Sequence, residues 1–165
     1  NKAINDSLVR IYGDIMWIEE NELRKSKFND LTMREMHAIH AISMYDHKST
    51  SEVAKELHLT PGTLTSMADR LVRKGYVIRL RSEDDRRVIR LGLTKKGRVV
   101  YRAHEAFHNM MVNSFLKDLD TTEIKTIEKA LWNLEQFLRE HSKFRGEKVW
   151  KKLKSYKLLI TSQRW

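Results

Sequence analysis

Hydrophobic residues recur at helical spacing in several separate segments of the chain. The first segment, residues 3–24, carries a row of apolar side chains on or near one face of the predicted helix, and Met16 and Trp17 widen it. The row consists of Leu8, Ile11, Tyr12, Ile15, Ile18 and Leu23. An apolar arc this broad exceeds what one surface helix needs to cover its own domain. We therefore expect this helix to be buried against a partner chain as well.

Two capping boxes mark the starts of the next helices, Thr32-x-x-Glu35 and Ser49-x-x-Glu52. In this motif the hydroxyl and the carboxylate satisfy backbone N–H groups that lack a helical partner. The inner side of the first helix is expected to carry Met36, Ile39, Ile42 and Ser43, and the second helix has a short apolar pattern at Val53, Ala54 and Leu57. The first helix is expected to end near Asp46, and the second is short.

A further helix is predicted to begin at Thr60-Pro61 and to end at Gly75. Threonine is a favoured N-cap, proline fits the first helical position, and glycine adopts the left-handed conformation that terminates helices. One buried stripe is formed by Leu64, Met67, Ala68 and Leu71, and the opposite face carries Thr63, Thr65, Ser66, Arg70 and Arg73. Small hydroxyls let a helix enter the major groove of DNA, where arginines reach guanine edges or phosphates. The alternative is an ordinary solvated face.

A β-hairpin follows this helix. Its strands are predicted from the runs Tyr76, Val77, Ile78, Leu80 and Val88, Ile89, Leu91, Leu93, with an arginine-rich tip at residues 81–87 between them. The tip resembles a minor-groove probe, in which Arg87 or Arg86 enters the groove and Asp85 holds the guanidinium by a bidentate contact. A solvated charged loop is the alternative interpretation.

Two long helices complete the pattern. Thr94 caps one that runs from Lys95 to about Lys117, and Asp120-x-x-Glu123 opens the last. Apolar seams follow their starts: Val99, Val100, Ala103, Phe107, Met110, Met111, Phe115 and Leu116, then Ile124, Ile127, Leu131, Leu134 and Leu138. The fold class is thus mainly α with a small β-hairpin wing, a winged helix-turn-helix. The surplus apolar surface predicts a homodimer that presents two recognition helices to a pseudo-palindromic operator, roughly 10–10.5 base pairs apart.

The net charge of +10 suits a polyanionic partner, and no residue of the chain is cysteine. Disulfides and thiolate chemistry are therefore excluded. Residues 1–147 are expected to form one unit, with dimerisation helices at 1–30 and 98–141 around a DNA-binding lobe at 31–97. The basic extension, residues 148–165, receives no role. The sequence has neither a signal-peptide pattern nor an apolar run long enough to span a membrane, so the cytoplasm is the expected compartment.

One motif points to a different class of protein. His104-Glu105-Ala106-Phe107-His108 matches the H-E-x-x-H pattern, in which two histidines bind zinc and the glutamate acts as a general base. A zinc hydrolase needs a third ligand, and nothing downstream of Asn109 matches the usual placement. Histidines at the surface or at a dimer interface, or a non-catalytic metal, are the other interpretations. We expect no enzyme and no cofactor.

Several motifs together resemble the MarR family of dimeric winged-helix regulators. They are Asp85-x-Arg87 in the wing and Leu93-Thr94-Lys95-Lys96-Gly97 after it, and the resemblance extends over residues 5 to 141. Within the family, Ile18-Glu19-Glu20, Leu23-Arg24-x-Ser26, Phe28-x-Asp30 and Glu35-Met36-His37 are similar to the branch that represses fatty-acid biosynthesis genes. The resemblance implies a transcriptional repressor with long-chain acyl-acyl carrier protein as corepressor. A regulator that responds to another small apolar or phenolic ligand is the alternative.

The candidate site residues fall into two sets. The expected DNA contacts are Ser49, Ser51, Thr60, Gly62, Thr63, Thr65, Ser66, Arg70, Arg73, Arg81, Ser82, Asp85, Arg86 and Arg87. The candidate lining of a ligand site is Ile15, Met16, Met36, Met110 and Phe115, because flexible methionines adapt to an apolar ligand. Asp69 is an acid where a neutral residue would suit DNA, and at i+4 spacing it is expected to pair with Arg73.

Overall fold

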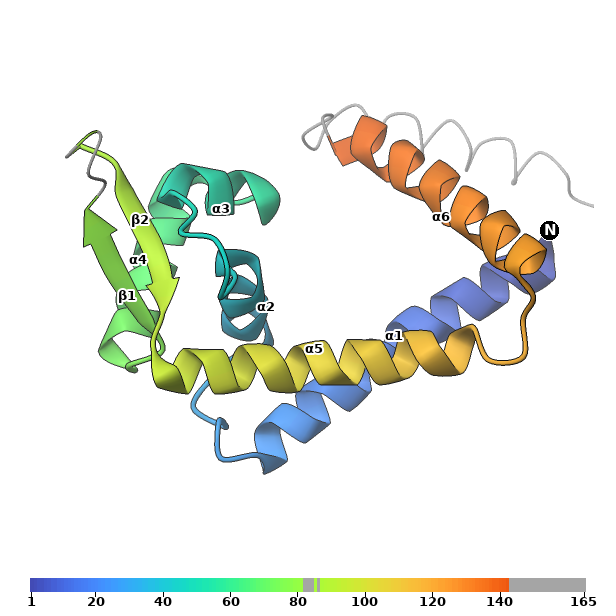
Figure 1. Ribbon diagram of the computed structural model, residues 1–165, viewed down its shortest axis with the longest axis horizontal. Coiled ribbons are helices and arrows are strands. Elements are labelled where there is room, and N and C mark those ends of the chain that lie inside the picture. Colours follow the sequence, from blue (N-terminus) through green and yellow to red (C-terminus); the bar gives the residue numbers. More distant parts are fainter. Residues whose placement is uncertain (82–84, 86, 143–165) are drawn as a thin grey trace, which may run out of the picture. The chain divides into compact units, whose positions relative to one another are not determined.

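The computed structural model describes residues 1–81, 85 and 87–142 of the chain. Its elements follow one another as α1 (Lys2–Lys25), α2 (Met33–Ile42), α3 (Thr50–Glu56), α4 (Pro61–Arg73), β1 (Val77–Arg81), β2 (Ile89–Leu93), α5 (Lys95–Phe115) and α6 (Thr121–Ser142). Figure 1 shows this order along the chain. The predicted order of four helices, a β-hairpin and two further helices is confirmed. The extension at 148–165 lies outside the described residues.

The helix starts follow the predicted capping chemistry. Thr32 and Ser49 each form a complete capping box, with Glu35 and Glu52 respectively, and Thr60 accepts a hydrogen bond from the N–H of Thr63 ahead of α4. Gly75 follows the end of α4 with φ +78°, in the left-handed region that a glycine adopts without strain. The three starts around the helix-turn-helix are therefore specified by local hydrogen bonds.

Helix α2 is shorter than expected. It ends at Ile42, and Ser43 has a φ of 66°, so the chain leaves the helix before Asp46. The Ser43 hydroxyl accepts a hydrogen bond from the N–H of Tyr45, which stabilises the turn. Serine competes for backbone donors in this way and so favours helix ends over helix interiors.

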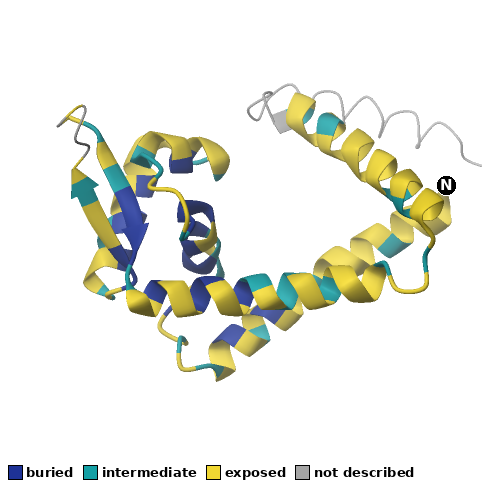
Figure 2. Ribbon diagram, viewed as in Figure 1, coloured by how far each residue is buried: buried dark blue, intermediate teal, exposed yellow. Residues whose placement is uncertain are grey.

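The core lies among α2, α3, α4 and the hairpin. Figure 2 shows that the buried residues gather there and at the adjoining parts of α1 and α5. All four residues of the predicted α4 stripe are buried, from Leu64 to Leu71. The hairpin is a two-stranded antiparallel sheet in which Val77 pairs with Leu93 and Arg81 with Ile89. This core holds α4 and the wing next to each other on one lobe.

The junction between the wing and α5 is tightly packed. The Thr94 side chain donates to Gly75 O at 2.7 Å and accepts from the N–H of Gly97 at 3.0 Å, capping α5. A Cβ at position 97 would overlap the carbonyl oxygen of Tyr76. The threonine and glycine of the Leu93–Gly97 motif thus dock the start of α5 against the end of α4.

The chain divides into two compact units, the first covering residues 1–111 and the second beginning at Val112. Within the second unit, Asp120 and Glu123 make reciprocal hydrogen bonds that open α6, as the spacing predicts. No α6 side chain that the structure describes is fully buried within a single chain. In the described residues, no helix has the length and apolar character needed to cross a membrane.

Candidate functional site

Helix α4 exposes the polar face that the sequence assigns to it. Thr63, Thr65, Ser66, Arg70 and Arg73 are exposed, and so is Gly62 in the first turn. Ser51 on α3 and Arg81 at the end of β1 are also exposed. The predicted contact residues on these elements therefore lie on the outside of the lobe that contains the helix-turn-helix.

Two of the predicted contact residues also have a structural role. Ser49 and Thr60 cap α3 and α4, and each accepts a backbone N–H at 3.2 Å. The Thr65 hydroxyl donates to the carbonyl oxygen of Pro61 at 2.9 Å. Removing the Ser49 or Thr60 hydroxyl would therefore weaken a helix start whether or not it contacts a ligand.

A buried carboxylate holds the basic residues at the end of α4. Glu35 on α2 is 2% exposed and lies 3.3 Å from Arg70 Nε and 2.8 Å from Lys74 Nζ. Burial by itself would raise the pKa of Glu35, but hydrogen bonds from Lys74 and the backbone of Thr32, with the charge of Lys74, lower it below its ordinary value. The Arg70 side chain is anchored by its Nε while 47% of it remains exposed.

The predicted pairing of Asp69 with Arg73 is wrong. Asp69 Oδ1 lies 2.7 Å from Nη1 of Arg79 on β1. Arg79 lies close to Asp69 because β1 turns back along α4. Helical spacing cannot predict this pair, because Arg79 lies outside the helix. The ion pair joins α4 to the wing and neutralises an acid near the basic face.

The wing places Asp85 and Arg87 in contact through the backbone. The Asp85 carboxylate accepts the backbone N–H of Arg87 at 2.9 Å, and the Asp85 carbonyl accepts the N–H of Val88 at 2.9 Å. Asp85 therefore orders the turn that carries Arg87, a role that differs from the predicted contact with the guanidinium. Both residues are exposed, whereas Ser82 and Arg86 lie outside the described residues.

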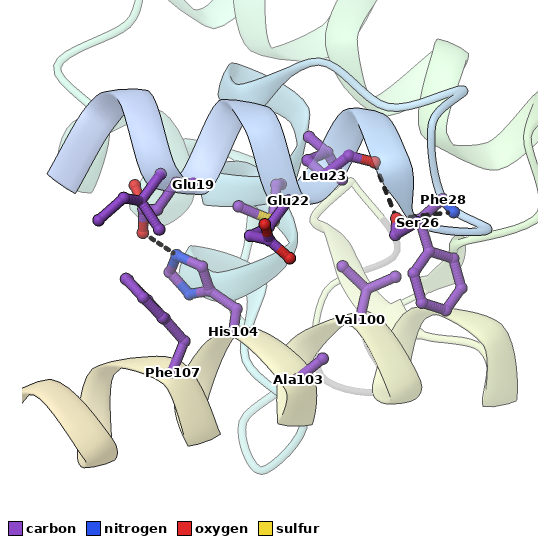
Figure 3. A pocket seen from close by; sticks show the side chains of 11 residues that line it. Glu19, Glu22, Leu23, Ser26, Phe28, Val100, Ala103, His104 and Phe107 are labelled. Atoms are coloured by element: carbon purple, nitrogen blue, oxygen red, sulfur yellow. Dashed lines mark hydrogen bonds and ion pairs between the residues drawn. The ribbon is translucent and has the colours of Figure 1, made fainter. Parts of the chain in front are cut away.

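A cavity of about 330 Å³ lies between α1, α2 and α5 within the first unit. Figure 3 shows Leu23 and Phe28 from the α1 side, and Val100, Ala103 and Phe107 from α5, around this space. Ile18 and Met36 complete the apolar lining, and the polar groups come from Glu19, Glu22, Ser26 and His104. Its size and mostly apolar wall are typical of a small-molecule site.

One end of the cavity adjoins a cluster of histidines around Glu19. Nε2 of His104 and Nε2 of His108 each lie 3.1 Å from Glu19 Oε1 and 3.1 Å from each other. His37 approaches the other carboxylate oxygen at 3.5 Å. Burial, followed by the neighbouring charge of His108, lowers the pKa of His104 to about 4, so its ring is neutral near pH 7. The H-E-x-x-H pair is thus joined by a carboxylate 85 positions upstream of His104, whereas the usual third ligand of a zinc hydrolase follows the motif.

Comparison with known proteins gives the family. The MarR family model matches residues 31–89. The crystal structure of Streptococcus pneumoniae FabT in complex with DNA superimposes with a TM-score of 0.76 and 44% sequence identity, covering 84% of this chain and 97% of that one. The chain belongs to the MarR family. It is a DNA-binding transcriptional regulator of that family, a class of proteins that are not enzymes.

Other MarR-family regulators are more distant. SarZ of Staphylococcus saprophyticus is 29% identical over 112 residues, which cover 68% of this chain and 73% of SarZ. The crystal structure of the S. aureus MepR–DNA complex has a TM-score of 0.63 at 21% identity and covers 79% of this chain and 94% of that one. The MepR likeness shows the winged-helix fold alone.

The structure brings only part of the predicted ligand set to the cavity. Met36 lines it, whereas Ile15 and Met16 are half-buried on α1 outside the lining. Met110 and Phe115 are 67% and 55% exposed. Ile18 and Phe107 also line the cavity, and the sequence identifies both only as apolar helix positions. Which helix faces meet in this MarR-family fold depends on packing between distant segments of the chain.

Proposed function

We propose that the protein is a repressor of fatty-acid biosynthesis genes that uses long-chain acyl-acyl carrier protein as its corepressor. The observation that carries this proposal is the 44% identity to FabT, which extends over 97% of the FabT chain and concerns a protein crystallised with DNA. The motifs at the end of α1 and the start of α2, whose residues resemble the branch of the MarR family that represses fatty-acid biosynthesis genes, border the apolar cavity.

The chemistry of α4 supports DNA as the partner. Its exposed hydroxyls are small, so the helix can approach base edges, and Arg70 is already oriented by Glu35. An anchored guanidinium loses less conformational freedom on binding, and arginine is well suited to bidentate contacts with guanine. Arg87 in the wing is the residue we propose for the minor groove.

The cavity supports an apolar ligand held between α1, α2 and α5. Ile18, Leu23, Met36 and Phe107 provide the wall, and the methionine side chain adapts to variable chain shapes. The basic character of the protein also suits an acidic carrier protein.

The corepressor is tested by titrating carrier protein into a mixture of this protein and duplex DNA from the promoters of fatty-acid biosynthesis genes of its own organism. Carrier protein loaded with long saturated or unsaturated chains should raise DNA affinity, while carrier protein without a chain should not. If the loaded and unloaded forms act alike, the corepressor proposal is wrong. An effect of free phenolic or other small apolar compounds instead would favour the alternative ligand class.

The role of the cavity as the acyl-chain site is tested with two alanine-to-leucine substitutions on α5. Ala103→Leu places additional atoms in the cavity and should abolish the response to acyl carrier protein while basal DNA binding remains. Ala106→Leu makes the same change at an exposed position outside the lining and should leave the response intact. Equal responses in the two variants would place the acyl chain elsewhere.

A further inference from the structure

The atoms around Glu19 form an arrangement that hydrogen bonds cannot satisfy. Glu19 Oε1, His104 Nε2 and His108 Nε2 lie at the corners of a triangle with every side 3.1 Å. A carboxylate only accepts, so both ring nitrogens would have to donate to it. The two nitrogens would then face each other as two donors. One contact in the triangle is unfavourable in either protonation state of the histidines.

A cation at the centre removes this conflict, because all three atoms would then present lone pairs to it. Zn²⁺ binds histidine nitrogen and carboxylate oxygen at about 2.0–2.1 Å, and tetrahedral geometry then separates neighbouring ligands by roughly 3.3–3.4 Å. The triangle's sides of 3.1 Å are close to that spacing. Mg²⁺ and Ca²⁺ prefer oxygen ligands in larger numbers, so the donor set favours a late transition metal.

The three groups are held in place by the fold. Glu19 and His104 are 6% and 8% exposed, and the histidines of α5 lie one helical turn apart. Figure 3 shows Glu19 on α1 directed at the His104 ring on α5. Little reorganisation would be required for an ion to bind, which limits the entropic cost of forming the site.

We propose that Glu19, His104 and His108 form a binding site for one Zn²⁺ ion per chain, which joins α1 to α5 beside the cavity. His37, whose Nε2 lies 3.5 Å from Glu19 Oε2, connects α2 to the same carboxylate. The ion therefore links the long helices to the first helix of the DNA-binding lobe. Because Glu19 and His104 also line the cavity, metal and apolar ligand influence one another.

The site binds metal without hydrolytic activity. Glu105, the general base of the H-E-x-x-H pattern, is directed at Tyr101, whose hydroxyl lies 3.5 Å from its Oε1. The family consists of regulators, and the role that fits this position is to set the relative position of α1 and α5.

The test is a zinc titration of the full chain, prepared without a histidine tag and stripped with a chelator, in competition with a chromophoric zinc chelator. One ion per chain should bind with micromolar affinity or better. His108→Gln and Glu19→Gln should each weaken binding at least about tenfold. His47→Gln, an exposed histidine outside the cluster, should bind as the wild type does. Circular dichroism of each stripped variant establishes that it is folded.

Cobalt substitution supplies a second measurement on the wild-type chain. Co²⁺ in this site should give the intense visible absorption of tetrahedral coordination, lost in His108→Gln. Weak binding with no visible band, or zinc affinity unchanged in both ligand variants, would overturn the proposal. Neither metal assay contains DNA or acyl carrier protein. A protein that does not bind zinc could therefore still be the proposed repressor, and a failed repressor assay would not contradict the zinc site.

Discussion

Glu35 shows how one side chain supports several features at once. Its carboxylate completes the capping box of α2, and from there it reaches Arg70 and Lys74 at the end of α4. The capping role is visible in the sequence because its partner is three residues away. The ion pairs join residues that are 35 and 39 positions apart, so only the folded chain shows them.

Glu35→Gln should lower the free energy of unfolding by about 1–3 kcal/mol near neutral pH, because buried hydrogen bonds to charged groups are lost. The folded-state pKa of Glu35 is lowered, so its contribution is complete above the ordinary value of 4.5 and is lost as pH falls through the folded value. Denaturant unfolding should therefore show that the difference in free energy of unfolding between the wild type and Glu35→Gln narrows below pH 4.5. Glu52→Gln, in the exposed capping box of α3, is the control and should cost less. A constant difference across pH would contradict this role.

Arg87→Ala should weaken operator binding by about 1–3 kcal/mol and make the salt dependence of binding shallower, since one cationic contact is removed. Fluorescence anisotropy at several salt concentrations measures both quantities. Arg24→Ala removes an exposed arginine on α1 that pairs with Glu20, and it should change neither. Unchanged binding by Arg87→Ala would show that the wing does not read the groove as proposed.

At the scale of elements, the connection from α4 through the hairpin to α5 depends on close backbone approach. Thr94 ties the start of α5 to Gly75, and Gly97 leaves room for the Tyr76 carbonyl. The position of α5 relative to the DNA-binding lobe is therefore set by contacts at its first turn. A change there should affect stability and DNA binding together.

Gly97→Ala should destabilise the protein by about 1–3 kcal/mol, because the added methyl overlaps backbone atoms that cannot rotate away. Gly13→Ala is the matched control: position 13 is helical with open space around it, so alanine should stabilise by roughly 0.5–1 kcal/mol. Thermal unfolding compares the two. Equal stability of both variants would show that the junction is more adaptable than its geometry indicates.

At the scale of the whole molecule, the long helices expose apolar side chains that a partner chain would cover. Trp17 on α1 is 68% exposed, and Phe137 and Leu138 on α6 are 54% and 56% exposed within a single chain. Exposed apolar residues in this number along a helix mark an interaction surface. We propose that a second copy of the chain covers it, which gives the paired recognition helices that a pseudo-palindromic operator requires.

Leu131→Glu combined with Leu138→Glu should shift the protein from dimer to monomer and abolish operator binding, because charges would replace apolar contacts in the interface. Light scattering coupled to size exclusion measures the mass. The control, Lys129→Glu, also adds acidic charge to α6 but at a polar position. A double variant that remains dimeric would place the interface elsewhere.

Local patterns in the sequence are enough to locate the helices and strands. The signals that locate them are the capping boxes, Thr60-Pro61, Gly75 and the apolar stripe of α4. Each signal acts between residues three or four positions apart, so it can be recognised in the sequence without the fold. The end of α2 was the exception, because Ser43 leaves the helix through a turn that periodicity does not reveal.

Which of these elements contact one another depends on tertiary packing. The cavity lining, the Asp69–Arg79 pair and the approach of Glu19 to His104, 85 residues away, depend on how helices pack across long stretches of chain. Periodicity identifies the apolar face of a helix but carries no information about its partner. The elements, apart from the end of α2, and the exposed basic face could therefore be predicted from the sequence, whereas the cavity and the carboxylate of the histidine cluster required the fold.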